Sequence, residues 1–150
     1  MSPPDNPLKP DSPHAETPRK PKHFNHLIGL KVERAVGGQS SCWLDAHELL
    51  YNPAKILHGG VTFSLADVGM GSALYSILAP HEYAITLEMK INYMKAVTTG
   101  RLTCETRVVE RTGDMAVLES EVRTDGALVA KALGTYAILK RKQTKPEVAS

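Results

Sequence analysis

The chain is poor in the features that mark proteins that bind nucleic acid. Only 5% of its 150 residues are aromatic, and 18 Lys and Arg are nearly balanced by 16 Asp and Glu, which gives a net charge of +2. A nucleic-acid-binding surface needs many phosphate contacts and usually carries a basic stripe with aromatic platforms. The one basic block, residues 140–142, is too short for that role. Nucleic acid is therefore not expected as a partner.

Cysteine and export signals are scarce as well. Cys42 and Cys104, the only two cysteines, fall in separate strand-like runs, without the close spacing of zinc sites or small disulfide scaffolds. The N-terminus lacks the apolar region of a secretory signal and carries too many acids for a typical transit peptide. Residues 61–80 form the longest apolar run, but their Ser, Thr, Gly and Asp residues make it too polar for lipid. A cytoplasmic protein without a membrane segment is expected.

The length of the chain suits one domain with a hydrophobic core. Seven of the ten prolines lie in the first 21 residues, where few apolar side chains are available to offset the entropy of ordering. We predict a flexible tail over residues 1–22, one domain over residues 23–140, and a second tail over residues 141–150.

The pattern within the domain predicts an α+β fold. A short amphipathic segment at residues 23–28 ends at Gly29, and Gly37 and Gly38 suit a turn that needs positive φ. Apolar spacing over residues 61–78 predicts one long helix that stops before Pro80. Period-two runs with Gly-containing breaks then predict a four-strand antiparallel meander, which most simply wraps around that helix. The predicted strands are residues 30–36, 40–49, 83–93, 101–111, 115–124 and 128–140.

Asp67 is the single charged residue between Val61 and Pro80. A carboxylate in apolar surroundings costs several kcal/mol unless it is paired or hydrogen-bonded, so Asp67 is either satisfied by local structure or used for chemistry. The same helix is rich in small residues (Gly, Ala and Ser), and its interior glycines weaken helix propensity by roughly 1 kcal/mol each. Either a sheet packs very close to it or a ligand approaches it directly.

These elements and residues together resemble a known family. Asn52, then His58, Gly59 and Gly60 leading into a helix, then Asp67 inside it and the strand from Ala84 to Tyr93, are similar to the hotdog-fold acyl-CoA thioesterases of the phenylacetic-acid-degradation (PaaI-like) type. The resemblance covers about residues 24–140. It implies a hotdog fold, an antiparallel sheet wrapped around one long central helix, and hydrolysis of an acyl- or aroyl-CoA to a free acid and CoA. It implies no metal and no cofactor, because CoA is part of the substrate.

The resemblance also implies roles for individual residues. The backbone N–H of Gly59, at a helix N-terminus, would stabilise the oxyanion. Asp67 would be the general base for water or the nucleophile that forms a mixed anhydride. Asn52 would position the water or the thioester, or is only a turn residue before Pro53. His58 would lie near the leaving sulfur, or is an ordinary loop residue, and Thr86 would hold the attacking water, or is an ordinary strand residue.

The substrate-binding residues are expected on the same helix and around it. Lys55 stands where many relatives carry glycine, and would attract the phosphates of CoA or be a solvated loop charge. Gly60 would let the thioester approach the backbone. The remaining candidates would line the acyl pocket: Phe63, Met70, Leu74 and Met89. These residues do not show whether the acyl group is an aromatic ring or an aliphatic chain.

In the family, Gly59 and Asn52 of one chain face Asp67 and Thr86 of another, so the resemblance implies a homodimer as the minimum and a dimer of dimers as a larger assembly. Open sheet edges also favour pairing. Two other functions stay open. A hotdog dehydratase acting on hydroxyacyl thioesters fits less well, because His58 precedes the helix. A non-catalytic acyl-CoA-binding protein would not require the combination of Asn52, Gly59 and Asp67.

Overall fold

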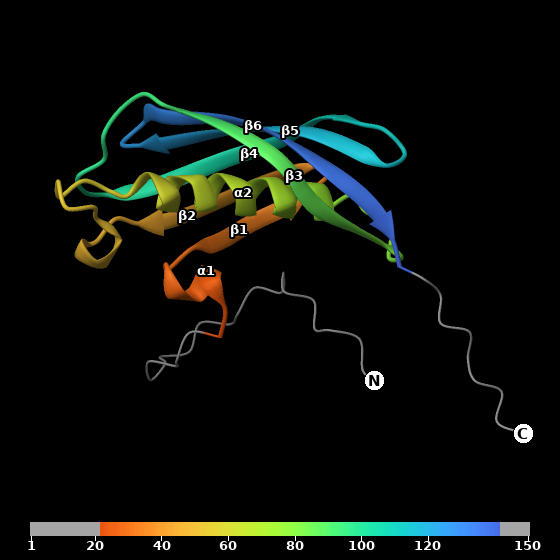
Figure 1. Cartoon of the computed structure of the whole chain (residues 1–150), viewed down its shortest axis with the longest axis horizontal. Helices are drawn as coiled ribbons and strands as arrows, with labels where there is room; N and C mark the ends of the chain where they lie inside the picture. The colour runs from red at the N-terminus through yellow and green to blue at the C-terminus, as the bar shows by residue number, and fades with distance from the viewer. Residues whose placement is uncertain (1–21, 142–150) are drawn as a thin grey trace, which may run out of the picture.

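The computed structural model describes residues 22–141, which form one sheet and one long helix (Figure 1). The two predicted tails lie outside the described residues, apart from Lys22 and Arg141 at their edges. No helix in residues 22–141 is long and apolar enough to cross a membrane. The elements are α1 (Phe24–Leu27), β1 (Lys31–Val36), β2 (Gln39–Asp45), the 3-10 turn η1 (Glu48–Leu50), α2 (Gly59–Tyr75), β3 (Glu82–Tyr93), β4 (Arg101–Arg111), β5 (Met115–Thr124) and β6 (Ala127–Lys140).

The sheet has six strands in the order β1-β2-β4-β5-β6-β3, and every neighbouring pair is antiparallel. The prediction of an α+β, hotdog-type wrapped sheet is confirmed, but the four-strand meander is wrong in one respect. β4, β5 and β6 form a meander, whereas β3 pairs with β6 at the far edge of the sheet. Residues 94–100 connect β3 to β4 across the domain, and Val97 is buried there, where its carbonyl accepts the Leu57 N–H at 2.8 Å.

Two of the turns follow directly from local sequence. Gly37 and Gly38 both have positive φ, 59° and 79°, as predicted for the tight hairpin between β1 and β2. Asp125 and Gly126, φ 49° and 77°, make the equivalent turn between β5 and β6. Positive φ at both central residues gives a turn whose twist matches that of the flanking strands.

The strand predicted over residues 40–49 is too long. β2 ends at Asp45, which pairs with Arg101, the first residue of β4. One further backbone bond follows, from the Ala46 N–H to the Gly100 carbonyl at 2.9 Å, before the chain turns into η1, where the Leu50 N–H bonds to the His47 carbonyl at 2.9 Å. The helix α2 also starts two residues earlier and ends three residues earlier than predicted.

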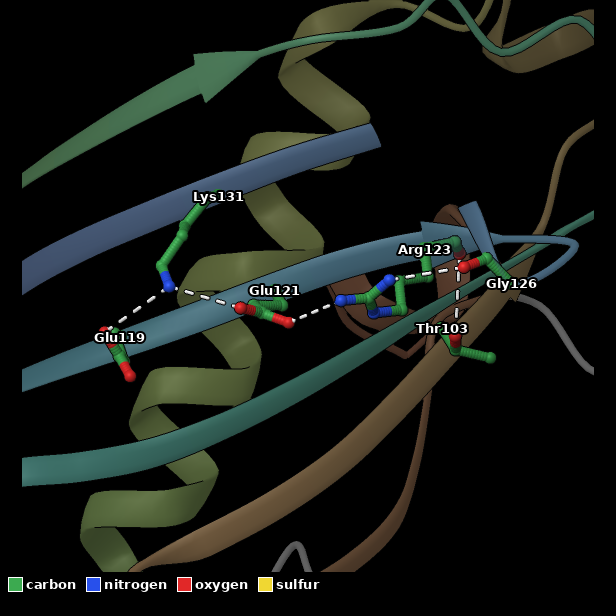
Figure 2. Close-up of polar contacts among 6 residues, drawn as sticks. All are labelled: Thr103, Glu119, Glu121, Arg123, Gly126 and Lys131. Atoms are coloured by element: carbon green, nitrogen blue, oxygen red, sulfur yellow. Dashed lines mark hydrogen bonds and ion pairs between the residues drawn. The ribbon is translucent and has the colours of Figure 1, made fainter. Parts of the chain in front are cut away.

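The inner face of the sheet packs on α2, and the outer face is largely polar. Alternate side chains of β4 and β5 are buried, among them Leu102, Cys104, Leu118 and Val122, as period-two strands require. On the opposite face, Lys131 of β6 bridges Glu119 and Glu121 of β5 at 3.8 and 3.2 Å, and Arg123 pairs with Glu121 at 2.8 Å (Figure 2). Exposed pairs of this kind add little stability.

Hydroxyl groups of the sheet hold α2 at short distance. Ser40 donates to the Gly69 carbonyl at 2.7 Å, and Ser120, itself bonded to Thr106 at 2.7 Å, lies 3.5 Å from the Ala66 carbonyl. A Cβ added to Gly69 would lie 2.6 Å from Thr106 Oγ1. Close packing by the sheet is therefore the reason for a small residue at Gly69.

Replacing Gly69 with alanine is expected to destabilise the protein by about 1–3 kcal/mol, because Thr106 is held by its hydrogen bond and cannot yield freely. Gly71, in the same helix, is the matched control. A Cβ there meets nothing within 4 Å, so Gly71→Ala is expected to stabilise by about 0.5–1 kcal/mol. Urea unfolding of both variants measures the difference, and equal destabilisation by the two changes would contradict the close packing at Gly69.

The two cysteines, far apart in sequence, are direct partners in the β2–β4 register, and both are fully buried and free. Burial raises the pKa of the Cys42 thiol to about 12 and that of Cys104 to about 11. As pH rises above the ordinary value of 9.0, the unfolded thiols lose their protons while the folded ones keep theirs. The unfolded state is then favoured.

The free energy of unfolding is therefore expected to fall between about pH 9 and pH 11, by at most about 1.4 kcal/mol per pH unit for each thiol. Urea unfolding at pH 8, 9.5 and 10.5 tests this. The variant that combines Cys42→Ala with Cys104→Ala is the control and should show a flatter dependence over that range. An equal slope in the variant and the wild type would exclude the thiols as the cause.

Candidate active site

His58 is the N-cap of α2. Its Nδ1 accepts the Gly60 N–H at 2.9 Å, and its carbonyl accepts the Val61 N–H at 2.9 Å. Since Nδ1 is an acceptor, the neutral imidazole carries its proton on Nε2. The N–H of Gly59, the first residue of the helix, has no acceptor within residues 22–141. Such a free N–H at the positive end of a helix is a preorganised donor for a developing negative charge.

The loop before the helix is closed by Asn52. Its Oδ1 accepts the Ala54 N–H at 2.9 Å and the Ile56 N–H at 3.4 Å, and its own N–H bonds to the Ile56 carbonyl at 2.8 Å. The side-chain oxygen is thus used by the turn, while the side-chain NH₂ has no partner within residues 22–141.

Lys55, the departure from the family pattern, sits in this turn with φ 58°. Glycine adopts that left-handed conformation without strain, which gives a physical reason for glycine at this position in relatives. Lysine adopts it here, and the Lys55 N–H still bonds to the Asn52 carbonyl at 2.9 Å. The loop path therefore does not depend on glycine.

Asn52 and Gly59 line one pocket of about 340 Å³, together with Thr62, Tyr93 and Lys95. Tyr93, at the end of β3, donates its hydroxyl to the Gly59 carbonyl at 2.9 Å. A Cβ on Gly59 would lie 3.3 Å from the Tyr93 ring. Burial raises the pKa of Tyr93, so this hydroxyl keeps its proton at neutral pH. Sequence reasoning missed Tyr93 as a site residue, because its pattern is that of an ordinary strand aromatic.

Asp67 lies two turns further along α2 and is half-buried. Thr86 of β3 donates to Asp67 Oδ1 at 2.9 Å, and the Tyr136 hydroxyl of β6 donates to the same oxygen at 2.6 Å. The structure thus brings Asp67 and Thr86 of the same chain together, as the resemblance implies. Tyr136 was missed by sequence reasoning. Its inward position follows from the alternation of β6, and a buried tyrosine hydroxyl usually has a partner.

Gly59 and Asp67 of one chain are too far apart to act on one carbonyl group. They are eight residues apart on the same helix, which is roughly 12 Å at 1.5 Å per residue. The described residues therefore form two half-sites, one around Gly59 and Asn52 and the other around Asp67 and Thr86.

The predicted substrate-binding residues lie in different surroundings. Met70 and Leu74 have no exposed surface and belong to the core beneath α2, whereas Phe63 is 37% exposed. Met89 is partly buried against the core, and Gly60 and Lys55 are exposed at the start of the helix and in the preceding turn. None of these six lines the pocket around Gly59, so their assignment to substrate remains a prediction.

A second hollow, of about 380 Å³, is lined by residues of β1, β2, β4 and β5, among them Arg107, Glu119 and Glu121. Arg107 pairs with Glu119, and Glu121 pairs with Arg123 and Lys131. Glu105, also in the lining, accepts the Ser41 hydroxyl at 2.6 Å. Since these acids are already paired or hydrogen-bonded, the hollow lacks a free base. In residues 22–141 no group of His, Cys, Asp and Glu side chains is arranged to hold a metal ion.

Comparison with known proteins agrees with the fold. Residues 54–131 match the family model of the thioesterase superfamily. A protein of Saccharolobus solfataricus that is named as an esterase is 31% identical over 132 residues, 87% of each chain. A second protein of that organism, also named as an esterase, is 34% identical over 83% of this chain and 89% of its own. The chain therefore belongs to the thioesterase superfamily, a family of hydrolases.

Solved structures place the chain among hotdog folds. A conserved protein of Pseudomonas aeruginosa is 39% identical, with a TM-score of 0.74 over 77% of this chain and 92% of its own. The phenylacetic acid degradation protein PaaI of Thermus thermophilus, solved as a mutant, is 24% identical, with a TM-score of 0.71 over 76% of this chain and 96% of its own. At that identity the likeness to PaaI shows the fold alone. The predicted hotdog fold and thioesterase family are confirmed.

Proposed function

We propose that the protein hydrolyses an acyl- or aroyl-CoA thioester to the free acid and CoA. The observation that carries this proposal is the presence of two half-sites in the chain: a free Gly59 N–H beside a pocket, and an Asp67 carboxylate fixed by two hydroxyls. A thioester hydrolase needs both, because the carbonyl oxygen gains negative charge while water loses a proton. Membership of the thioesterase superfamily supports the reaction class.

In the proposed reaction, the thioester carbonyl oxygen accepts the Gly59 N–H. Asp67 acts in one of two ways. As a base it takes a proton from water, whose oxygen attacks the carbon, and as a nucleophile it attacks the carbon itself and gives an anhydride that water then opens. Collapse of the tetrahedral intermediate breaks the C–S bond, and the CoA sulfur leaves as a thiolate. In the base route the thiolate takes up the proton that Asp67 removed from water, and in the nucleophile route it takes up the proton released by the water that opens the anhydride. No cofactor takes part, and CoA enters only as part of the substrate.

The neighbouring side chains have supporting roles in this proposal. His58, which carries a proton on Nε2, lies at the turn where the leaving sulfur would pass. Asn52 would direct its free NH₂ to the thioester or water, and Thr86 would accept a hydrogen bond from the attacking water while donating to Asp67. Lys55, exposed in the preceding turn, would attract the CoA phosphates.

We further propose that the active site is shared between two subunits, since the half-sites of one chain are roughly 12 Å apart. β3 is an edge strand twelve residues long, paired only with β6 (Figure 1). Ile85 and Leu87 on it are 47% and 54% exposed. A long open edge with apolar side chains favours pairing with a second copy. We propose a dimer as the minimum assembly and a dimer of dimers as the larger one. We also propose that the protein is located in the cytoplasm.

The test is a panel of aromatic and aliphatic acyl-CoAs with detection of released thiol, run on the full-length protein after sizing by light scattering. Thiol release from at least one member is expected. Tight binding of an acyl-CoA in calorimetry without thiol release would instead favour a binding protein, and hydration or dehydration of a hydroxyacyl-CoA would favour a dehydratase. An active monomer would overturn the shared site.

A further inference from the structure

The hydroxyl of Tyr136 touches two oxygens of Asp67. It donates to Oδ1 at 2.6 Å and lies 3.1 Å from the main-chain carbonyl of the same residue. Tyr136 is 3% exposed and Asp67 is half-buried, so the tyrosine reaches the carboxylate from the buried side. The shorter contact is to the carboxylate, so the hydroxyl links the Asp67 side chain of α2 to β6.

Thr86 completes the arrangement from the neighbouring strand. It is the direct register partner of Tyr136 in the β3–β6 pair, and its hydroxyl donates to the same Oδ1 at 2.9 Å. The register shifts between Thr86 and Glu88, where β3 carries one extra residue, Leu87. Bulges re-aim side chains and are frequent beside active sites. Within residues 22–141 no group donates to Oδ2 of Asp67.

We propose that Tyr136 is a positioning residue that, together with Thr86, holds Oδ1 of Asp67 so that Oδ2 alone is presented to the reactants. This role rests on the proposed thioester hydrolysis. The terminal torsion of an aspartate is broad, so a carboxylate without these donors would sample many orientations. A carboxylate held by the two hydroxyls keeps its free oxygen in the geometry needed for reaction, and the rate depends strongly on that geometry. Burial, and after it the hydrogen bond to Asp67, raises the pKa of Tyr136, so its hydroxyl remains a donor across the neutral range.

The test is Tyr136→Phe in the full-length protein. The ring keeps its packing and only the hydroxyl is lost. We expect kcat to fall about tenfold or more, since a hydrogen bond to a charged group is removed, with KM within about twofold of the wild type. Tyr83→Phe is the matched control. It lies on β3, its hydroxyl has no partner within residues 22–141, and its kcat should not change.

A second measurement separates positioning of Asp67 from a general effect on the fold. In an Asp67→Asn background, Tyr136→Phe should lower kcat little further, because the carboxylate that it positions is gone. Thr86→Val should lower kcat in the same direction as Tyr136→Phe. A full additional loss in the Asp67→Asn background, or a loss of activity that follows only a fall in Tm, would overturn the role of Tyr136.

The outcomes also separate this inference from the proposed function. An active wild type whose kcat is unchanged by Tyr136→Phe would overturn the role of Tyr136 and leave thioester hydrolysis in place. A wild type that releases no thiol from any acyl-CoA would overturn the proposed function, and this role with it.

Discussion

Asp67→Asn is expected to reduce kcat for thioester hydrolysis by about 10²–10⁴-fold, the usual contribution of a general base. The amide has nearly the same shape as the carboxylate, and its oxygen can still accept the hydroxyls of Thr86 and Tyr136. What is lost is the oxygen that takes a proton or attacks carbon. Thiol release at saturating acyl-CoA measures the loss in kcat, and thermal unfolding verifies that the variant is folded.

The control for this change is Asp125→Asn. Asp125 is exposed in the tight turn between β5 and β6, with φ 49°, and asparagine before glycine is equally suited to such a turn. Activity and Tm should stay at the wild-type level. If Asp67→Asn retained full activity on the best substrate of the panel, Asp67 would be neither base nor nucleophile.

Gly59→Pro is expected to reduce kcat by about 10²–10³-fold, the effect of removing one oxyanion donor. Proline has no N–H, and Gly59 is the first residue of α2, where proline is well tolerated. His58 before it has φ −62° and ψ 131°, an extended conformation that suits the residue preceding a proline. The substitution therefore removes the donor while leaving the helix able to form.

Gly59→Ala distinguishes the effect of losing the N–H donor from the effect of crowding the Tyr93 ring. A Cβ at this position lies 3.3 Å from the Tyr93 ring, and alanine introduces that crowding while it keeps the N–H. The proline variant should lose far more activity than the alanine variant, with thiol release and circular dichroism measured on both. Equal activities of the two variants would mean that crowding, rather than loss of the N–H, lowers the rate.

A mixture of two inactive variants tests the shared site. Since Gly59→Pro and Asp67→Asn are each expected to lose most of the activity, unfolding and refolding them together should restore part of it, because one of the two active sites in a hybrid dimer then has an intact Gly59 opposite an intact Asp67. Each variant refolded alone is the control. Failure to recover activity in mixtures shown to contain hybrid dimers, for example by a different affinity tag on each variant, would overturn the shared site.

Elements whose conformation depends on a few neighbouring residues could be predicted from the amino-acid sequence alone. Gly37, Gly38, Asp125 and Gly126 specify tight hairpins because their conformations depend on a few neighbouring residues. Period-two runs predicted β4 and β5 with their observed bounds. The order of Asn52, the His-Gly-Gly turn and Asp67 along the chain indicated the thioesterase family, which the comparisons confirm.

Contacts between residues far apart in the sequence became known from the folded structure. The position of β3 beside β6, the pairing of Cys42 with Cys104, and the contact of Tyr136 with Asp67, 69 residues away, arise from the strand order. Local propensity and periodicity contain no information on that order, since it is set by how the whole sheet closes around α2. The chemistry of Asp67 could be predicted from its sequence motif, whereas the two hydroxyls that fix its orientation depend on the packing of three separate elements.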